Sequence, residues 1–218
     1  MESIIRTKFK NKSLRPSQRI WLDRQSRDVY VKQAQKEGYR SRSAFKLIEI
    51  NDKFKILKPS MKVVDLGSSP GGWSQILASK INKKLSGRVI ALDIKNMHPI
   101  TGVEFYKLDI LKINSTNISD IIKCKVDAVF SDMSPSSTGH SLTDQLRSEK
   151  LCLSALDFSR LILEKGGDFC FKFLRGIGEK EILKLTAKYF NLVKVYKPDS
   201  SRKASKEIFI ICRCYKNL

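Results

Sequence analysis

The sequence predicts an α/β fold, with a seven-stranded and mostly parallel sheet, an antiparallel last strand, and helices on both faces. From residue 62 onward, short apolar runs alternate with helical stretches, which is the pattern of a parallel sheet covered on both faces. The last two runs are joined by a polar, basic loop over Lys197–Ser205 that has no helical pattern. Strands joined without a crossover helix pair antiparallel, so the sheet is expected to end in an antiparallel hairpin.

Seven apolar runs of strand length give the expected strands. They are Lys62–Leu66, Arg88–Asp93, Val103–Lys107, Asp127–Ser131, Asp168–Phe173, Asn191–Tyr196 and Lys206–Cys214. Between several of them we expect helices, over 73–81, Asp144–Leu163 and Glu179–Tyr189. In the first of these helices the apolar residues fall on one helical face; they are Trp73, Ile76, Leu77 and Ile81.

A further helix is expected ahead of the sheet, from Ser43 to Ile50. Ser43 is a suitable N-cap because its hydroxyl can accept a hydrogen bond from a free N–H of the first turn. Phe45, Ile48 and Ile50 can then face a core.

The chain is strongly basic. Its 42 Lys and Arg exceed its 22 Asp and Glu, which gives a net charge of +20. Such a charge attracts polyanions, and it favours nucleic acid over an anionic membrane surface. The first 46 residues hold 13 basic and 4 acidic residues with interleaved aromatics, a pattern that suits phosphate contacts and base stacking, although a solubilising tail is the simpler alternative.

The length and composition indicate one folded domain. The 218 residues, 41% of them hydrophobic, suffice for a sizeable core. We divide the chain into a basic, partly flexible N-terminal extension, residues 1–30, and a single domain, residues 31–218. No segment has the roughly 18 consecutive apolar residues of a membrane span, so no membrane association is expected.

The cysteines indicate a reducing compartment. The five cysteines form no C-x-x-C pair and are accompanied by only two histidines, so no metal site is expected. An odd number in apolar surroundings is typical of small core residues in a cytoplasmic protein.

A glycine-rich turn follows the first expected strand and opens a helix. From Val63 to Ser74 it reads VVDLGSSPGGWS. A phosphate-binding P-loop needs a lysine where Trp73 stands, and a dinucleotide fingerprint needs a glycine where Ser69 stands. Both phosphate ligands are therefore disfavoured, while a tight turn without a ligand stays an alternative.

Carboxylates stand at or just after the ends of the expected strands around this turn. Asp93, about 20 residues past the turn, is placed to accept hydrogen bonds from both hydroxyls of a ribose. Asp109, after the third strand, is placed near an adenine amino group. Carboxylates suit a positive sulfonium better than a pyrophosphate. The turn therefore predicts S-adenosylmethionine as the ligand, held also by Asp65, Gly67 and Gly72 of the turn.

In five ordered segments the chain resembles the FtsJ-type family of ribose 2′-O-methyltransferases, specifically its bacterial large-subunit ribosomal RNA branch. The segments are RSRSAFKL from Arg40, DLGSSPGGWSQ from Asp65, SDMSP from Ser131, FKF from Phe171 and SKEIF from Ser205. The resemblance runs from about Lys32 to the C-terminus. It implies a Rossmann-like S-adenosylmethionine-dependent methyltransferase fold and, as substrate, a uridine in the A-loop of 23S ribosomal RNA.

The resemblance also implies the site residues. The K-D-K-E tetrad of the family carries over onto Lys46, Asp132, Lys172 and Glu207. Its cofactor positions carry over onto Gly71, Trp73, Asp93, Asp109 and Asp132. The expected partner is ribosomal RNA or the large ribosomal subunit, with the protein acting as a monomer.

Lys172 is expected to be the general base. It interrupts the apolar run Phe169–Phe173, where a charge is costly unless it has a use. A ribose hydroxyl is a poor nucleophile, so removal of its proton assists methyl transfer. Lysine is protonated at neutral pH, but a second lysine nearby and desolvation favour the neutral amine. Lys46 is expected to tune the base or position the ribose, while Asp132 and Glu207 orient the two amino groups.

Other interpretations stay open. The segment Ser131–Pro135 is also similar to the motif of base amino-methyltransferases, but Ser136 stands where those enzymes have an aromatic residue. Lys46 could be a surface residue and Glu207 a rim salt bridge. Methylation of transfer RNA or mitochondrial ribosomal RNA, and a non-catalytic RNA-binding role in ribosome assembly, are the alternative functions.

Overall fold

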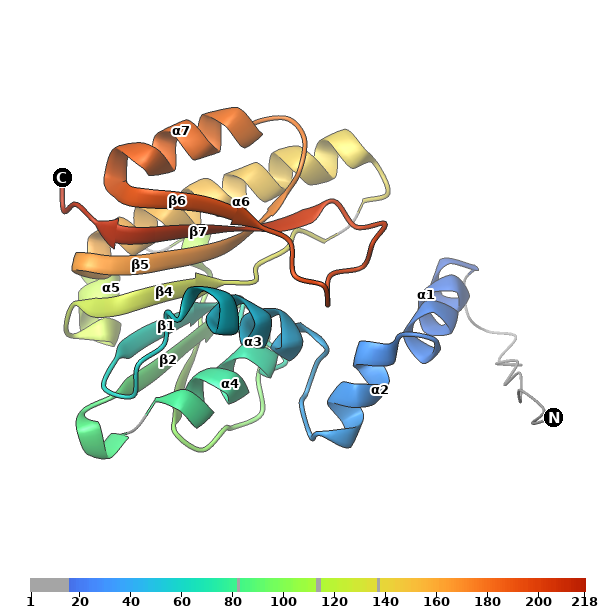
Figure 1. Cartoon of the computed structure of the whole chain (residues 1–218), viewed down its shortest axis with the longest axis horizontal. Coiled ribbons are helices and arrows are strands. Elements are labelled where there is room, and N and C mark those ends of the chain that lie inside the picture. Colours follow the sequence, from blue (N-terminus) through green and yellow to red (C-terminus); the bar gives the residue numbers. More distant parts are fainter. Residues whose placement is uncertain (1–15, 82, 113–114, 137) are drawn as a thin grey trace.

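The computed structural model describes residues 16–81, 83–112, 115–136 and 138–218. In this part of the chain seven strands form one sheet in the order β3-β2-β1-β4-β5-β7-β6 (Figure 1). They are β1 (Lys62–Leu66), β2 (Arg88–Asp93), β3 (Val103–Lys107), β4 (Val126–Ser131), β5 (Leu163–Leu174), β6 (Phe190–Tyr196) and β7 (Glu207–Tyr215). Strand β7 pairs antiparallel with β5 and β6, and the other pairs are parallel. The predicted mostly parallel sheet with an antiparallel last strand is confirmed.

The strands agree with the sequence prediction to within one residue at each end, except at the start of β5. This strand begins at Leu163 instead of Asp168. Leu163 pairs with Val126 of β4, and the register shifts before Asp168 pairs with Ala128. The residues just after Leu163, 164–166, are exposed, so no apolar run marks this segment in the sequence.

Helices cover both faces of the sheet, as predicted. One face carries α5 (Ser115–Ile122), α6 (Ser141–Ile162) and α7 (Glu179–Tyr189), and the other carries α3 (Ser43–Phe54) and α4 (Gly72–Lys80). Two short 3₁₀ helices, η1 (Lys83–Leu85) and η2 (Ile110–Lys112), lie in connections. Helix α5 was not predicted from the sequence, and α6 starts three residues before the predicted Asp144.

Side chains of β5 divide between the two faces. Phe169, Phe171 and Phe173 belong to the core under α5, α6 and α7, whereas Cys170 belongs to the core under α3 and α4. Successive side chains of a strand point to opposite faces. Lys172 therefore lies on the same face of the sheet as Cys170, beneath the helix that carries Lys46.

The predicted N-cap of α3 is wrong. Helix α3 begins at Ser43, and Arg42 takes the capping position without a side-chain capping hydrogen bond. The Ser43 hydroxyl is instead hydrogen-bonded to the Ser41 hydroxyl at 2.7 Å. The helix continues past the predicted Ile50 to Phe54. It is held by packing, because Leu47 and Ile50 are fully buried.

Two helices precede α3 and lie beyond the edge of the sheet at which β7 begins (Figure 1). They are α1 (Pro16–Ser26) and α2 (Val29–Lys36). Asp28 caps α2, since its carboxylate accepts a hydrogen bond from the backbone N–H of Tyr30 at 3.1 Å. The boundary drawn after residue 30 falls within α2, and residues 1–15 of the predicted extension lie outside the described residues. None of the described helices has the length and apolar character needed to cross a bilayer.

Candidate active site

The turn between β1 and α4 approaches the turn that follows β4. Gly67 has a φ of +73°, in the left-handed region that favours glycine. A Cβ at this position would lie 2.6 Å from Cγ of Met133 and 3.0 Å from its Cα. Glycine is therefore required here because Met133 lies against the backbone, and this approach brings the end of β1 next to Asp132.

Two later glycines of the turn are packed against other protein groups. Gly71 has a φ of +118°, and a Cβ there would lie 2.7 Å from Cδ1 of Ile100. A Cβ at Gly72 would collide with the Ser41 hydroxyl. At these glycines the close approaches in the structure are to the protein itself, so they define the path of the turn.

Arg40 fixes the turn from outside. Its guanidinium donates hydrogen bonds to the carbonyl oxygens of Pro70 at 3.3 Å, His98 at 2.6 Å and Pro99 at 2.8 Å. The chain after β2 is thereby tied to the turn after β1. Arg40 belongs to one of the family segments, but no role was predicted for it from the sequence.

Asp93 ends β2 beside the glycine-rich turn. Its two carboxylate oxygens accept hydrogen bonds from the backbone N–H groups of Ser69 at 2.8 Å and Lys95 at 2.7 Å. The Ser69 N–H is thus occupied by a carboxylate, whereas a P-loop directs such groups at a phosphate. The remaining lone pairs of Asp93 can accept further hydrogen bonds from hydroxyl groups.

Asp65 is fully buried beneath the turn. One of its oxygens accepts a hydrogen bond from the Ser74 hydroxyl at 2.6 Å. Its other oxygen and the buried Ser68 hydroxyl have no hydrogen-bond partner among the described residues. Burial raises the pKa of Asp65 to about 7 against the effect of the Ser74 hydrogen bond, and the negative charges of Asp132 and Asp93 raise it further. The gathering of three carboxylates at the turn suits a positively charged ligand such as a sulfonium.

Asp109 and Trp73, the two other predicted cofactor residues, lie in different surroundings from each other. Asp109, just after β3, is partly exposed, and its carboxylate accepts a hydrogen bond from the backbone N–H of Leu111 at 3.0 Å. Trp73 is 2% exposed, and its indole N–H donates to the carbonyl oxygen of Ser43 at 2.8 Å. Its ring packs against that of Phe209. The side chain of Trp73 thus joins α4 to α3 in the core, which leaves its backbone as the part that can meet a ligand.

The four residues of the predicted tetrad come from four elements that meet at one edge of the sheet. Asp132 directly follows β4, Lys172 lies near the end of β5, and Glu207 begins β7. Because β7 runs antiparallel to β5, its first residue lies where β5 ends. Lys46 reaches this edge from the first turn of α3.

Lys172 and Asp132 form the first of two lysine–carboxylate pairs. The Lys172 amino group donates to Oδ1 of Asp132 at 2.8 Å and to its backbone carbonyl oxygen at 2.7 Å. Burial acts to raise the pKa of Asp132, but the positive charges of Lys172 and Lys46 outweigh it and hold this pKa below its usual range. Asp132 is therefore a carboxylate at neutral pH.

Lys46 and Glu207 form the second pair. The Lys46 amino group lies 2.8 Å and 2.9 Å from the two carboxylate oxygens of Glu207. Burial acts to raise the pKa of Glu207, but the charge and hydrogen bond of Lys46 hold it below its usual range, while the charge of Asp132 raises it. Since Lys46 also lowers the pKa of Asp132, the two pairs lie within electrostatic reach of each other.

A network of charges beside the tetrad was missed by the sequence analysis. The side chain of Asp28, only 9% exposed, accepts hydrogen bonds from Arg42 at 2.5 Å and from Arg202 at 3.1 Å. Arg42 also donates to the carbonyl oxygen of Ser200 in the loop between β6 and β7. Glu49 holds the same loop, because its carboxylate accepts from the backbone N–H of Ser200 at 3.0 Å. No spacing pattern in the sequence connects these distant positions.

Comparisons with known proteins identify related methyltransferases. A protein of Pelagibacter ubique named ribosomal RNA large subunit methyltransferase E is 45% identical over 194 residues, covering 88% of this chain and 94% of that protein. A protein of the same name from Francisella tularensis is 44% identical over 206 residues, covering 92% and 97%. A crystal structure from Plasmodium falciparum described as a ribosomal RNA methyltransferase matches with a TM-score of 0.73 and 31% identity, covering 81% of this chain and 98% of that one.

The family match includes the glycine-rich turn and all four tetrad positions. The model for FtsJ-like methyltransferases matches residues 39–215, which confirms the resemblance found in the sequence. The chain belongs to the FtsJ-like methyltransferase family.

Proposed function

We propose that this protein methylates the ribose 2′-hydroxyl of a uridine in large-subunit (23S) ribosomal RNA, with S-adenosylmethionine as the methyl donor. The observation that carries the proposal is the pair of contacts Lys172–Asp132 and Lys46–Glu207 at the edge of the sheet beside the glycine-rich turn. The relatives named ribosomal RNA large subunit methyltransferase E support the substrate class. The net charge of +20 suits a polyanionic substrate.

The cofactor is proposed to be held by the turn and the carboxylates around it. Gly67, Gly71, Gly72 and Trp73 offer backbone groups. Asp93 is the proposed acceptor for the ribose hydroxyls and Asp109 for the adenine amino group. Asp132 supplies negative charge, and Asp65 lies buried beneath the turn. Support comes from the unpaired buried oxygens of Asp65 and Ser68 and from the carboxylates that raise the pKa of Asp65. When bound, S-adenosylmethionine supplies an electrophilic methyl group.

Lys172 is the proposed general base. In its neutral form the amino nitrogen accepts the proton of the ribose 2′-hydroxyl, which leaves the oxygen lone pair free to form the new O–C bond. Asp132 fixes the position of this nitrogen through its carboxylate and its backbone carbonyl. Such a proton transfer contributes about 100-fold to 10,000-fold to a rate.

Lys46 is proposed to position the ribose. Its contact with both oxygens of Glu207 holds its amino group in place, where it can donate a hydrogen bond to the ribose. We expect the protein to act as a monomer in the cytoplasm and to contribute to assembly of the large ribosomal subunit.

Methyl transfer from labelled cofactor to RNA tests this proposal. Naked ribosomal RNA and assembled large subunits serve as alternative substrates, and transfer RNA serves as the comparison. The product is digested to nucleosides and the methylated nucleoside is identified. The expected product is 2′-O-methyluridine from ribosomal RNA. A methyl group on a base nitrogen, or cofactor binding without transfer to any RNA, would overturn the proposal.

A further inference from the structure

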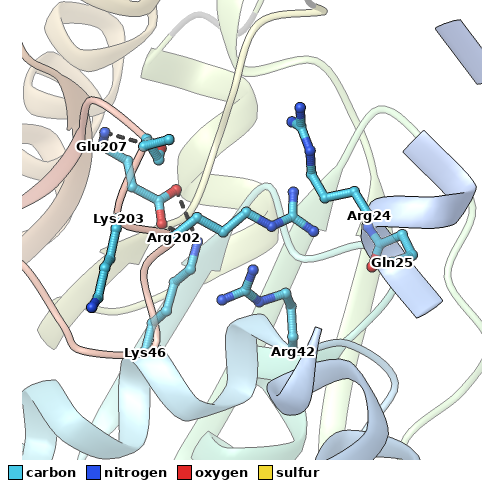
Figure 2. A pocket seen from close by; sticks show the side chains of 9 residues that line it. Arg24, Gln25, Arg42, Lys46, Arg202, Lys203 and Glu207 are labelled. Atoms are coloured by element: carbon cyan, nitrogen blue, oxygen red, sulfur yellow. Dashed lines mark hydrogen bonds and ion pairs between the residues drawn. The ribbon is translucent and has the colours of Figure 1, made fainter. Parts of the chain in front are cut away.

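A basic cavity opens next to the Lys46–Glu207 pair. Its volume is about 580 Å³, and three separate parts of the chain enclose it: α1, the start of α3 and the loop between β6 and β7. The charged side chains that line it are Arg24, Arg42, Lys46, Arg202, Lys203 and Glu207. Figure 2 shows Arg202 extending from the loop toward Arg24 on α1, with Arg42 and Lys46 rising from α3.

The charges of this cavity are not balanced. Five cations line it and Glu207 is the one anion among the lining residues described. Asp28 lies behind the cavity and pairs with Arg42 and Arg202. Even with both carboxylates counted, three positive charges remain without a compensating anion. Arg24 on α1 is exposed and takes part in no ion pair with a described residue. The cavity is therefore suited to an anion.

Two buried guanidinium nitrogens also lack an acceptor. Nε of Arg42 and Nη2 of Arg202 are shielded from solvent and have no hydrogen-bond partner among the described residues. A buried donor without an acceptor is unfavourable. Arg42 donates its two terminal nitrogens to Asp28 and to the carbonyl oxygen of Ser200, and Arg202 donates its Nε to Asp28. The free donors thus belong to side chains that the protein already holds in fixed positions.

We infer that this cavity binds a phosphodiester group of the RNA strand next to the nucleotide being methylated. The inference rests on the proposed function, since it assigns a substrate contact to the same site. Planar guanidinium groups match the oxygens of a phosphate with parallel hydrogen bonds. The cavity shares Lys46 and Glu207 with the tetrad, so a strand whose ribose reaches Lys172 passes directly beside it. The volume leaves room for the sugar attached to the phosphate.

This assignment gives α1 a function in substrate positioning. Arg24 is the contribution of α1 to the charge of the cavity, and it faces Arg42 and Arg202 across it. A phosphate between them neutralises charges that otherwise repel each other. Binding of the RNA strand would thereby hold α1 against the catalytic edge of the sheet.

The test uses the full chain without cofactor and a short, fluorescein-labelled single-stranded RNA. Binding is measured by fluorescence anisotropy over a series of KCl concentrations. For single strands the slope of log K against log salt changes by about 0.7 per phosphate contact. We expect Arg24→Gln and Arg202→Gln each to reduce the slope by about 0.7. The control is Lys165→Gln, which removes one exposed cation at the opposite end of β5 and is expected to leave the slope unchanged.

Two further measurements keep the outcomes distinct. Arg202→Gln breaks an ion pair with buried Asp28 and is checked for folding by thermal unfolding; Arg24→Gln has no such pair to break. Polyglutamate tests for an acidic protein as the occupant. The inference is overturned if Arg24→Gln and Arg202→Gln both show the same slope of log K against log salt as Lys165→Gln. It is also overturned if polyglutamate competes for the protein more strongly than unlabelled RNA does. Reduced slopes without any ribose methylation would instead leave the phosphate site standing and contradict the proposed function.

Discussion

The amino group of Lys172 is hydrogen-bonded twice to Asp132, at 2.8 Å to the carboxylate and at 2.7 Å to the backbone carbonyl oxygen. Lysine side chains are flexible, so two acceptors from one residue define the position of the nitrogen far better than the aliphatic stem does. The carbonyl acceptor belongs to the residue after β4, and the backbone N–H of Asp132 donates to Leu66 of β1 at 3.2 Å. The position of the proposed base is thus set by the three central strands β1, β4 and β5.

Replacing Asp132 by asparagine should slow methyl transfer while leaving the protein folded. The variant keeps the backbone acceptor for Lys172 but loses the carboxylate charge. We expect the rate of transfer to fall about 100-fold, at the low end of the contribution of a positioned base. Single-turnover transfer to RNA measures the rate, and calorimetric titration with S-adenosylmethionine measures how much of the loss is due to cofactor binding. A rate within a few-fold of the natural protein at saturating cofactor would contradict the orienting role of Asp132.

Gly67→Ala should destabilise the fold and displace Asp132. A left-handed alanine costs about 1 kcal/mol, and overpacking against Met133 adds about 2 kcal/mol. Because Met133 follows Asp132 in the chain, relief of this contact moves the proposed catalytic carboxylate. Gly166→Ala is the matched control: Gly166 has a φ of +86° and open space around its Cβ position. We expect the control to lose about 1 kcal/mol and to keep its methyl transfer rate. Equal losses in denaturant unfolding for the two variants would show that the contact with Met133 is unimportant.

The free energy of unfolding of the protein should depend on pH through the titration of Asp65. Its pKa is raised to about 7 in the folded protein, compared with about 3.9 in an unfolded chain. Between these two pH values the folded chain holds a proton that the unfolded chain has lost, so the contribution of this group to the free energy of unfolding falls as the pH rises. Asp65→Asn removes this titration. The free energy of unfolding of the variant minus that of the natural protein should therefore grow from pH 4 to pH 7, by at most about 4 kcal/mol. A difference that stays constant across this range would contradict the burial of a titrating Asp65.

The sequence sufficed to locate the edge of the sheet that carries the site. Lys172 stood out because a charge within a run of aromatic residues is costly, and in the structure Phe171 and Phe173 are fully buried on either side of it. Asp93 could be placed because it ends a predicted strand, and parallel strands end at one edge. Lys172 and Asp93 were thus located from local pattern and the geometry of a sheet alone, whereas Asp132 was placed by the family motif.

Contacts between distant segments could not be predicted from local sequence pattern. Arg202 and Asp28 are 174 positions apart, and their meeting depends on how α2 and the loop after β6 pack against α3. The side chain of Trp73 shows a related limit. The family motif assigned it to the cofactor, yet its spacing with Ile76 and Leu77 also predicted a core face, and the structure places the ring in the core. A motif identifies a position but not which part of the residue acts.

The most direct test of the account compares two replacements of Lys172. Lys172→Ala removes the proposed base, whereas Lys172→Arg keeps a positive charge that can pair with Asp132 but cannot be deprotonated. The rate of methyl transfer to RNA is measured in a single turnover at saturating cofactor, with cofactor affinity and melting temperature checked in parallel. Both variants are expected to bind the cofactor and to lose transfer by about 1,000-fold. Transfer by the arginine variant within a few-fold of the natural rate would contradict this expectation, because the residue would then act through its charge and not as a base.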